Sequence, residues 1–192
     1  CSFTGVHMGT YGNSTATDLE LSRSDQDQWA YQSHQRAIQA IEAGRLQEEI
    51  APVAVKQRKG DPILVEQDEA PRKDTTFEKL SSLKPAFDRD GSITAGNAPG
   101  INDGAGALVL MSEDKAVNEG YSIGAKIIGH AEIAVEAKDF PKTPGLVINE
   151  LLKKTGKTVD EIDLFEINEA FAAVALASGK LANLDSDKVN VN

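Results

Sequence analysis

The sequence of 192 residues predicts an α/β protein, because strand-like and helix-like apolar patterns alternate along its last third. Apolar strand patterns cover 105–111, 124–135 and 162–167, and glycines or short helical patterns separate them. The first half differs, since a long helical pattern is followed there by a hairpin pattern. We therefore expect two differently built parts, with the boundary near residues 96–112.

In the first half, residues 1–20 are polar and rich in glycine, serine and threonine, which predicts mostly loop. A helix is expected over 22–44, with Ser22 as its N-cap, an acid three residues later and glycine as its C-cap. The segments EIAPVAVKQ and DPILVEQDE alternate on either side of RKGD and predict a β-hairpin. A short helix is expected at 76–83, within an irregular stretch over 70–95.

In the second half, a glycine-rich turn over 96–104 leads into the strand pattern of 105–111, and a short helix follows that ends at Gly120. After the strand pattern of 124–135, TPGLVINELLKKTG is amphipathic and predicts a helix over 143–156. The segment VDEIDLFEINEAFAAVALASGKLA reads as a strand and then an alanine-rich helix. The sequence has no initial Met and ends in a further alternating pattern, KVNVN, so we expect an internal piece of a longer protein.

Composition and charge exclude several classes of protein. The net charge of -10 argues against nucleic-acid binding, which needs clustered basic side chains. No window approaches the roughly 18 apolar residues of a membrane span. A single cysteine, Cys1, excludes an internal disulfide framework and a cysteine-based zinc site, and the three histidines lack metal-site spacing. We expect a cytoplasmic protein that holds no metal.

The most informative segment is DLFEINEAFAAVALASGK, because it places Asn168 and Glu169 where a buried strand pattern meets a buried helix pattern. Ligands of α/β proteins bind at such junctions. An asparagine there can hold a water or stabilise a developing oxyanion, and the glutamate can orient its neighbours. The alternative is structural: Asn168 is then a helix N-cap and Glu169 an acid of the first helical turn.

Other candidate segments are individually weak. His7 and Met8 of HMG can line a pocket or lie on a surface loop. Arg72 is a candidate for phosphate binding or a solvated cation. GNAPGINDGAGA, at 96–107, allows close backbone approach to a ligand. It lacks the context of a dinucleotide-binding fingerprint, and it has no Gly-Lys-Ser/Thr of a phosphate-binding loop.

Taken together and in this order, HMG, RKGD, EAPRKDTTFEKLSSLKPAFDRDGSITAGNAPGINDGAGALVLMSE and DLFEINEAFA resemble the thiolases, and among them the members that form acetoacetyl-CoA. The resemblance implies the layered αβαβα thiolase fold. It implies that residues 1–95 are most of the CoA-contacting loop domain. Residues 96–120 would then carry the last strand of the N-terminal domain, and 121–192 the first half of the C-terminal domain.

The resemblance also implies roles for individual residues. Asn168 would hold the catalytic water of an oxyanion hole, with Glu169 supporting it. His7 and Met8 would contact the pantetheine and the short acyl group, and Arg72 the adenine-ribose end of CoA. Residues along the pantetheine tunnel would be Phe87, Ala95, Ala98, Pro99, Ala170 and Phe171.

Two departures from the family pattern concern the local network. Pro99 stands where family members usually have serine, and proline offers no donor to the pantetheine amide. After HMG the family typically reads Thr-Ala-Glu-Asn, whereas this sequence has Tyr-Gly-Asn-Ser at 11–14. We therefore expect CoA to be held somewhat differently here.

By resemblance, the parent protein condenses two acetyl-CoA into acetoacetyl-CoA and CoA, or runs the reverse thiolysis, through an acyl-cysteine ping-pong mechanism. The substrates are CoA thioesters, no cofactor is needed, and the protein is a homodimer or homotetramer. The nucleophilic cysteine, a Gly-His-Pro histidine and a second cysteine are expected outside this chain, so the chain alone would be inactive. The alternatives are a longer-chain 3-ketoacyl-CoA thiolase and a non-catalytic, thiolase-like acyl-CoA-binding protein.

Overall fold

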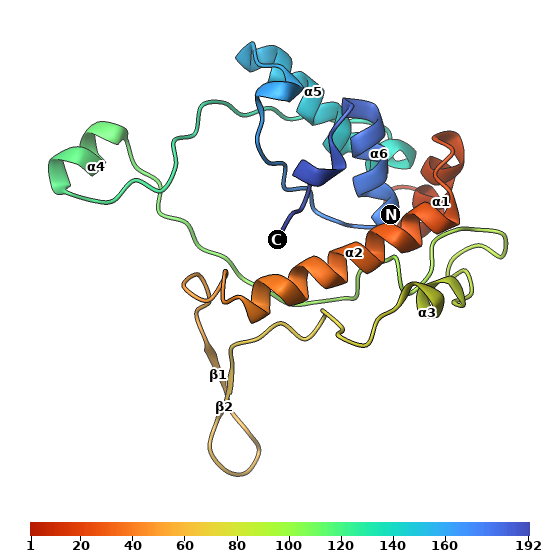
Figure 1. Ribbon diagram of the computed structural model, residues 1–192, viewed down its shortest axis with the longest axis horizontal. Coiled ribbons are helices and arrows are strands. Elements are labelled where there is room, and N and C mark those ends of the chain that lie inside the picture. Colours follow the sequence, from red (N-terminus) through yellow and green to blue (C-terminus); the bar gives the residue numbers. More distant parts are fainter.

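The longest element is helix α2 (Arg23–Glu42), which runs along one side of the molecule in Figure 1. The computed structural model describes all 192 residues. The predicted capping box is present, because Ser22 accepts from the backbone N–H of Asp25 and the Asp25 carboxylate accepts from the backbone N–H of Ser22. Helix α2 contacts α3 and α6 and thereby joins the two halves of the sequence.

Residues 8–18 form helix α1 (Met8–Asp18), so the predicted loop over 1–20 is wrong for most of its length. The segment MGTYGNSTATD has weak helix propensity. The helix forms because His7 caps it by accepting from the backbone N–H of Gly9, and because its small residues pack closely on α6. Tertiary contacts therefore outweigh local preference here.

The predicted hairpin consists of β1 (Val53–Val55) and β2 (Ile63–Val65), which are antiparallel with Val53 opposite Val65. It projects from the rest of the molecule and is exposed on both faces (Figure 1). The short helix α3 (Phe77–Ser81) follows, capped by Thr76 as expected for the 76–83 segment.

The predicted strands over 105–111 and 124–135 are not formed as paired strands. Both segments are extended, but neither has a hydrogen-bonded neighbour, and a strand is stable only within a sheet. One leads out to helix α4 (Glu113–Glu119) at the far end of the molecule and the other leads back from it, and the two ribbons diverge from α4 in Figure 1. Large apolar side chains on them lie in solvent, such as Leu108, which is 90% exposed. We call residues 101–136 the extended arm.

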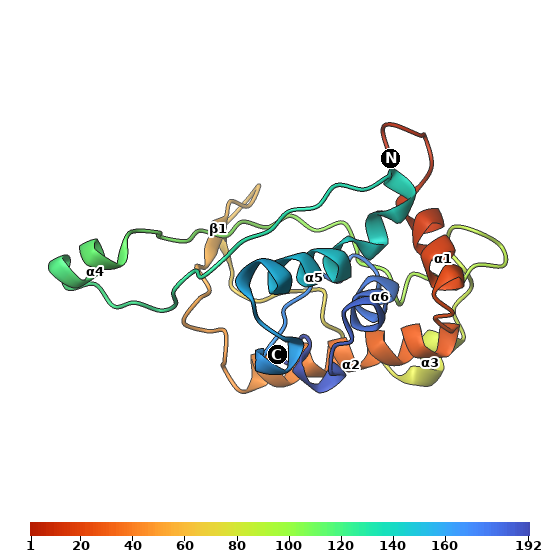
Figure 2. The same ribbon diagram turned by 90° about the horizontal axis from the view of Figure 1, so that it is seen from above.

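The C-terminal third contains helices, 3-10 turns and one bridge, joined by irregular segments. It contains the 3-10 turn η1 (Ala137–Lys142), helix α5 (Thr143–Thr155), the turn η2 (Val159–Glu161), helix α6 (Ala172–Ala182) and the turn η3 (Ser186–Lys188). Helix α5 packs against α6 (Figure 2). The predicted strand over 162–167 is reduced to a parallel bridge between Phe165 and Val189, because no further strand lies beside it.

Helix α6 lies at the centre of the core, since its residues belong to both apolar clusters. One cluster joins α2 and α3 to α6 through Trp29, Ala30, Leu80, Phe165, Ile167, Ala172, Ala175 and Val189. The other lies beside α1 and contains Ala16, Ile93, Phe171, Ala173 and Val174. This position explains why the α6 sequence is alanine-rich and nearly free of charge. None of the helices is long and apolar enough to cross a membrane.

Candidate active site

The second core cluster gathers predicted site residues from four separate stretches of the sequence. Met8, Phe87, Ala98 and Ala170 are half-buried and pack against it, and Phe171 is one of its buried members. The resemblance assigned all five to the acyl and pantetheine contacts. The chain therefore brings these residues into one continuous apolar surface, which we call the α1–α6 cluster.

Three aromatic rings connect the ends of this cluster. His7 stacks on Phe87 with ring centroids 4.4 Å apart and an interplanar angle of 21°. Phe87 meets the edge of Phe171 at 6.3 Å and 77°. Such pairs stabilise a definite ring orientation beyond the burial of area. His7 is exposed, so the stack runs from the core to the surface.

Two glycines of α1 allow this close packing. A Cβ on Gly9 would collide with the ring of Phe87, and a Cβ on Gly12 would collide with the side chain of Ile93 and press against Phe171. Gly12 belongs to the Tyr-Gly-Asn-Ser departure from the family pattern. Its lack of a side chain is used here to bring α1 onto the α1–α6 cluster.

Asn13, in the same departure, fixes the loop that carries Phe87. Its Oδ1 accepts from the backbone N–H groups of Ser92 and Ile93, both at 3.0 Å, and its Nδ2 donates to Oδ2 of Asp88 at 2.6 Å. The side chain is buried and all of these groups are satisfied by one another. Asn13 thus forms a fully satisfied network with the loop over 88–93.

Asn168 and Glu169 do not cap helix α6. That helix begins at Ala172, its N-cap is Phe171, and no side chain caps it, so the structural alternative for the Asn-Glu pair is wrong. The Asn168 side chain is exposed and makes no hydrogen bond within the chain, while its carbonyl accepts from the N–H of Ala170 at 3.0 Å. An exposed amide beside an apolar cluster is available to a ligand or to water.

Glu169 is the most heavily bonded residue of the pair. Its Oε1 accepts from the indole N–H of Trp29 at 2.9 Å and from Nδ2 of Asn190 at 2.8 Å. Its Oε2 accepts from Oγ of Ser33 at 2.7 Å. The carboxylate therefore joins α2 to the segment before α6. The sequence did not reveal these partners, because they lie between 21 and 140 residues away.

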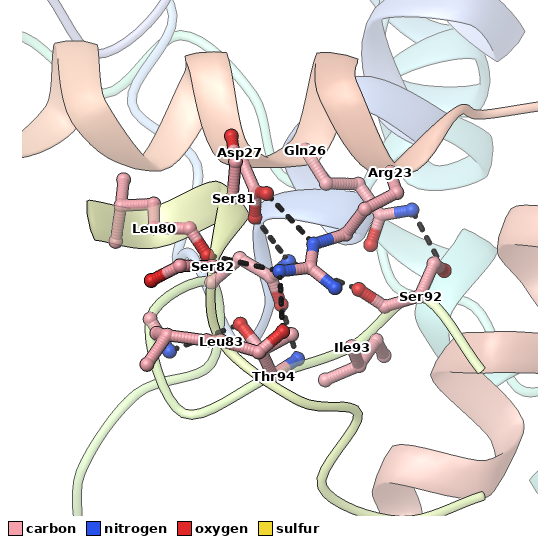
Figure 3. Close-up of polar contacts among 12 residues, drawn as sticks. Arg23, Gln26, Asp27, Leu80, Ser81, Ser82, Leu83, Ser92, Ile93 and Thr94 are labelled. Atoms are coloured by element: carbon pink, nitrogen blue, oxygen red, sulfur yellow. Dashed lines mark hydrogen bonds and ion pairs between the residues drawn. The ribbon is translucent and has the colours of Figure 1, made fainter. Parts of the chain in front are cut away.

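A buried ionic network ties α2 to the loop before the extended arm. Arg23 Nε lies 2.7 Å from Oδ2 of the fully buried Asp27, and its Nη2 donates to the carbonyl oxygens of Leu80 and Leu83 (Figure 3). The other Asp27 oxygen accepts from Nδ2 of Asn97 at 2.9 Å. The pairing satisfies a charge that would be costly if left alone.

Asn97 extends this network to the start of α6. Its carbonyl accepts from the backbone N–H of Ala172 at 2.9 Å, and its Oδ1 accepts from the N–H of Thr94 at 2.8 Å. It therefore links the Ala98 and Phe171 sides of the α1–α6 cluster. Sequence reasoning missed Asn97, although an aspartate facing an arginine four residues earlier in α2 was a usable signal for a buried pair.

Three further predicted site residues belong to neither the cluster nor the Asn-Glu pair. Ala95 and Pro99 are exposed on the loop around Asn97. Arg72 is exposed on the loop after the hairpin, where its backbone N–H donates to Nδ1 of His34 at 3.2 Å. The chain does not bring the Arg72 side chain to the other candidates, and its contact with CoA stays a prediction.

His34 is the titratable group near the site whose protonation the structure perturbs. Burial and the positive charge of Arg72 lower the pKa of His34, while Glu169 and Asp74 oppose this change. The neutral ring is the form that accepts the hydrogen bond from the Arg72 N–H. His34 therefore joins α2 to the loop that carries Arg72.

No group of three or more His, Cys, Asp or Glu side chains is arranged to hold a metal ion. Two surface hollows are present, and the second reaches Ala16 at the edge of the α1–α6 cluster. One is lined by the end of α2 and the base of the hairpin, including Ile41 and Pro52. The other lies between the end of α1 and the 90–92 loop. Neither contains Asn168 or the aromatic stack.

Comparison with known families decides the relationship. Residues 1–114 match the thiolase N-terminal domain, and residues 121–192 match the thiolase C-terminal domain. The chain belongs to the thiolase family. The predicted family is thereby confirmed, while the finer division at residues 95 and 120 stays a prediction.

Individual thiolase relatives resemble the chain over nearly all of its length. It is 44% identical over 190 residues to a probable acetyl-CoA acyltransferase of Staphylococcus epidermidis, covering 99% of this chain and 48% of the relative. It is 44% identical over 191 residues to an acetyl-CoA acetyltransferase of Pseudomonas aeruginosa, covering 100% of this chain and 49% of the relative. The chain thus spans about half the length of these thiolases.

A solved structure confirms the predicted fold class. The crystal structure of the Bacillus anthracis acetyl-CoA acetyltransferase superposes with a TM-score of 0.94 and 44% identity, over 97% of this chain and 47% of that one. Because 97% of the chain is covered, the superposition includes most of the extended arm as well as the packed elements.

Proposed function

We propose that this chain is part of a longer acetyl-CoA C-acetyltransferase that condenses two acetyl-CoA into acetoacetyl-CoA and CoA, or catalyses the reverse thiolysis. The observation that carries the proposal is the gathering of Met8, Phe87, Ala98 and Phe171 in one apolar cluster, with the exposed Asn168 two residues before its member Ala170. The relatives named as acetyl-CoA acetyltransferases support the same chemistry.

The proposed chemistry has two halves. A cysteine outside this chain attacks the first acetyl-CoA, the thioester bond breaks, and CoA leaves. A base then removes a proton from the methyl carbon of the second acetyl-CoA, and the resulting enolate attacks the acyl-cysteine. The new carbon–carbon bond gives acetoacetyl-CoA, and the cysteine thiolate leaves.

In this scheme Asn168 holds a water that donates to the thioester oxygen as negative charge develops there. Such a donor contributes about 3–4 kcal/mol when it is preorganised. Glu169, held by its three donors, orients the backbone that carries Asn168. Met8 and Phe87 limit the space for the acyl group, and Ala98 and Ala170 leave room for the pantetheine arm.

The chain alone is proposed to be inactive, since the cysteine nucleophile, the Gly-His-Pro histidine and the second cysteine would come from the rest of the protein. The extended arm is proposed to pair with strands of those missing segments. The whole protein is proposed to be a cytoplasmic homodimer or homotetramer whose substrates are CoA thioesters, without a metal or redox cofactor. Sedimentation of the full-length protein tests its assembly.

The longer-chain thiolase and the non-catalytic binding protein are less favoured. The acetyltransferase relatives point to a short acyl group, and Met8 packs against the α1–α6 cluster, where it occupies the space that a longer chain would need. Rates for acetoacetyl-CoA and longer 3-ketoacyl-CoA thioesters separate the two enzymes. A full-length protein that binds CoA without turnover would favour the binding protein.

The direct test is Asn168→Ala in the full-length protein, followed by thiolysis of acetoacetyl-CoA. The variant should lose about 100- to 1000-fold in kcat, because the oxyanion donor is removed. The matched control is Asn118→Ala, on the exposed surface of α4, whose side chain makes no hydrogen bond. Equal rates for the two variants would overturn the assignment of Asn168.

A further inference from the structure

Asn190 uses its whole side chain to bind the backbone around the Asn-Glu pair. Its Oδ1 accepts from the backbone N–H of Ile167 at 2.7 Å, and its Nδ2 donates to the carbonyl of Ile167 at 2.8 Å. The same Nδ2 donates to Oε1 of Glu169 at 2.8 Å. One side chain therefore holds the residues immediately before and after Asn168.

Asn190 is itself held from a different direction. Its backbone N–H donates to the carbonyl of Phe165 at 2.9 Å, and the Phe165 N–H donates to the carbonyl of Lys188 at 2.8 Å. Arg36 Nη1, from α2, donates to the carbonyls of Val189 and Asn190 at 2.8 and 3.2 Å. The position of the amide therefore does not depend on Asn168.

The backbone at Asn190 has φ of 48°, in the left-handed region that few residues other than glycine adopt readily. Asparagine tolerates this region and also carries a donor and an acceptor at the spacing of a peptide group. Both properties are used here. A serine would be too short for both bonds to Ile167, and an aspartate would lack the donor.

We infer that Asn190 is a positioning residue for Asn168: its side chain clamps Ile167 and Glu169, and so sets where the Asn168 amide points. The expected effect of Asn190 on catalysis rests on the proposed acetyl transfer. The structural part of the inference, the clamp on Ile167, is independent of any activity. A preorganised donor loses much of its effect when it moves by about 1 Å, so the clamp should act mainly on kcat.

The clean deletion is Asn190→Gly, because glycine accepts the positive φ without strain while removing the amide. The matched control is Asn183→Gly. Asn183 ends α6 with φ of 52°, is exposed, and makes no side-chain hydrogen bond. The two substitutions make the same chemical change at the same backbone conformation, and only one of them touches the Asn-Glu pair.

The kinetic test uses the full-length protein. Asn190→Gly should lower kcat for acetoacetyl-CoA thiolysis by about tenfold or more and change KM by less than about threefold, while Asn183→Gly leaves both unchanged. Combined with Asn168→Ala, the Asn190→Gly change should cost less than about threefold further, because it acts through Asn168. An undiminished tenfold loss in that background would overturn the inference.

Hydrogen exchange gives a readout that needs no activity. The Ile167 amide should exchange at least about tenfold faster in Asn190→Gly than in the wild type, and unchanged in Asn183→Gly. Unchanged exchange at Ile167 in Asn190→Gly would overturn the clamp. A wild-type protein that transfers no acetyl group would refute the proposed function, and the exchange result would still decide on the clamp.

If Asn190→Gly does not fold, Asn190→Asp provides the second variant. It keeps the size, the backbone preference and the acceptor for the Ile167 N–H, but it places a carboxylate against Glu169. A lower kcat is expected, because the donor to the Ile167 carbonyl and to Glu169 is lost. A wild-type kcat would overturn the inference.

Discussion

At the scale of a single residue, Glu169 is the acceptor that links three separate segments of the chain. Its carboxylate receives an indole N–H from Trp29, a hydroxyl from Ser33 and an amide from Asn190. Hydrogen bonds to a charged acceptor are stronger than neutral ones, and their donors are costly to leave unpaired. Glu169 is therefore a structural requirement as well as a neighbour of the candidate catalytic residue.

We expect Glu169→Ala to lower the free energy of unfolding of the full-length protein by about 2–3 kcal/mol, because three donors lose their acceptor. Urea unfolding measures the change. The control is Glu166→Ala, three residues earlier, where the side chain is exposed and makes no hydrogen bond, and a change within about 0.5 kcal/mol is expected. Equal effects of the two substitutions would contradict the role given to Glu169.

His34 should make stability depend on pH. Burial and Arg72 lower its pKa in the folded protein, so below the ordinary value of 6.5 the unfolded chain binds more protons than the folded one. This contribution to stability is fully present above pH 6.5 and is lost as the pH falls through the lowered pKa. Urea unfolding from about pH 8 to about pH 5 should show a smaller decline in His34→Gln than in the wild type.

The matched control for this measurement is His130→Gln, since His130 is exposed and its side chain makes no hydrogen bond. It should retain the wild-type decline. A decline that persists unchanged in His34→Gln would show that other groups cause it.

Many residues of the candidate site could be predicted from the sequence, because they lie in continuous sequence motifs. HMG, KPAFDRDGSITAGNAPG and NEAFA are continuous motifs, so Met8, Phe87, Ala98 and Phe171 could each be named before their convergence was visible. Asn97 and Asn190 could not, because the side-chain partners that matter, Asp27 for Asn97 and Ile167 and Glu169 for Asn190, lie 70, 23 and 21 residues away. A single sequence carries no direct record of such pairs.

At the scale of elements, α1 shows how small residues permit a helix that its propensity disfavours. Gly9 and Gly12 cost helix stability, yet they allow the close contact with Phe87, Ile93 and Phe171 that keeps α1 in place. The loop predicted for residues 1–20 followed the propensity and missed the contact. Helix α2 was predicted with its capping box because caps are local signals.

Two helical glycines should respond to alanine in opposite directions. Gly12→Ala should destabilise the full-length protein by about 1–3 kcal/mol, because the new methyl group overlaps Ile93. Gly179→Ala, in α6, should stabilise it by about 0.5–1 kcal/mol, because nothing lies near the added Cβ and alanine favours the helix. Thermal unfolding of both variants checks the signs, and a stabilising Gly12→Ala would contradict the packing described for α1.

The strand patterns over 105–111 and 124–135 differ from α1, because here regular structure was predicted and did not form. Periodicity correctly marks 105–111 and 124–135 as apolar and extended, but a pattern does not supply the hydrogen-bonded neighbour that makes a strand. The fold class was predictable because it follows from the order of patterns and from the family motifs. The pairing was not, since it depends on chain beyond each segment.

At the scale of the whole molecule, the extended arm leaves an unusual amount of apolar surface in solvent. Ile101, Leu108 and Val109 are 105%, 90% and 85% exposed. Unpaired apolar strands of this kind associate readily with one another. The isolated chain should therefore behave differently from the full-length protein.

We expect the purified 192-residue chain to bind a hydrophobic dye strongly and to self-associate. Replacing Leu108 and Leu110 by lysine should reduce both effects in the isolated chain. The same substitutions should destabilise the full-length protein, where these side chains are proposed to be covered. Dye fluorescence measures the exposed apolar surface of the isolated chain, and light scattering measures its self-association. Urea unfolding measures the stability of the full-length protein. A full-length protein indifferent to both lysines would contradict the proposed pairing of the arm.

Helix α2 also has a consequence for how the protein is made. Its partners include Leu80, Asn97, Glu169 and Asn190, and its most distant hydrogen bond, from Arg36 to the Asn190 carbonyl, spans 154 residues. At about 5–20 residues per second, the ribosome needs roughly 8–30 s to supply that last partner. Until then the apolar side of α2, with Trp29, stays uncovered on the growing chain. Co-translational folding of this region is therefore complete only after residue 190 has left the ribosome.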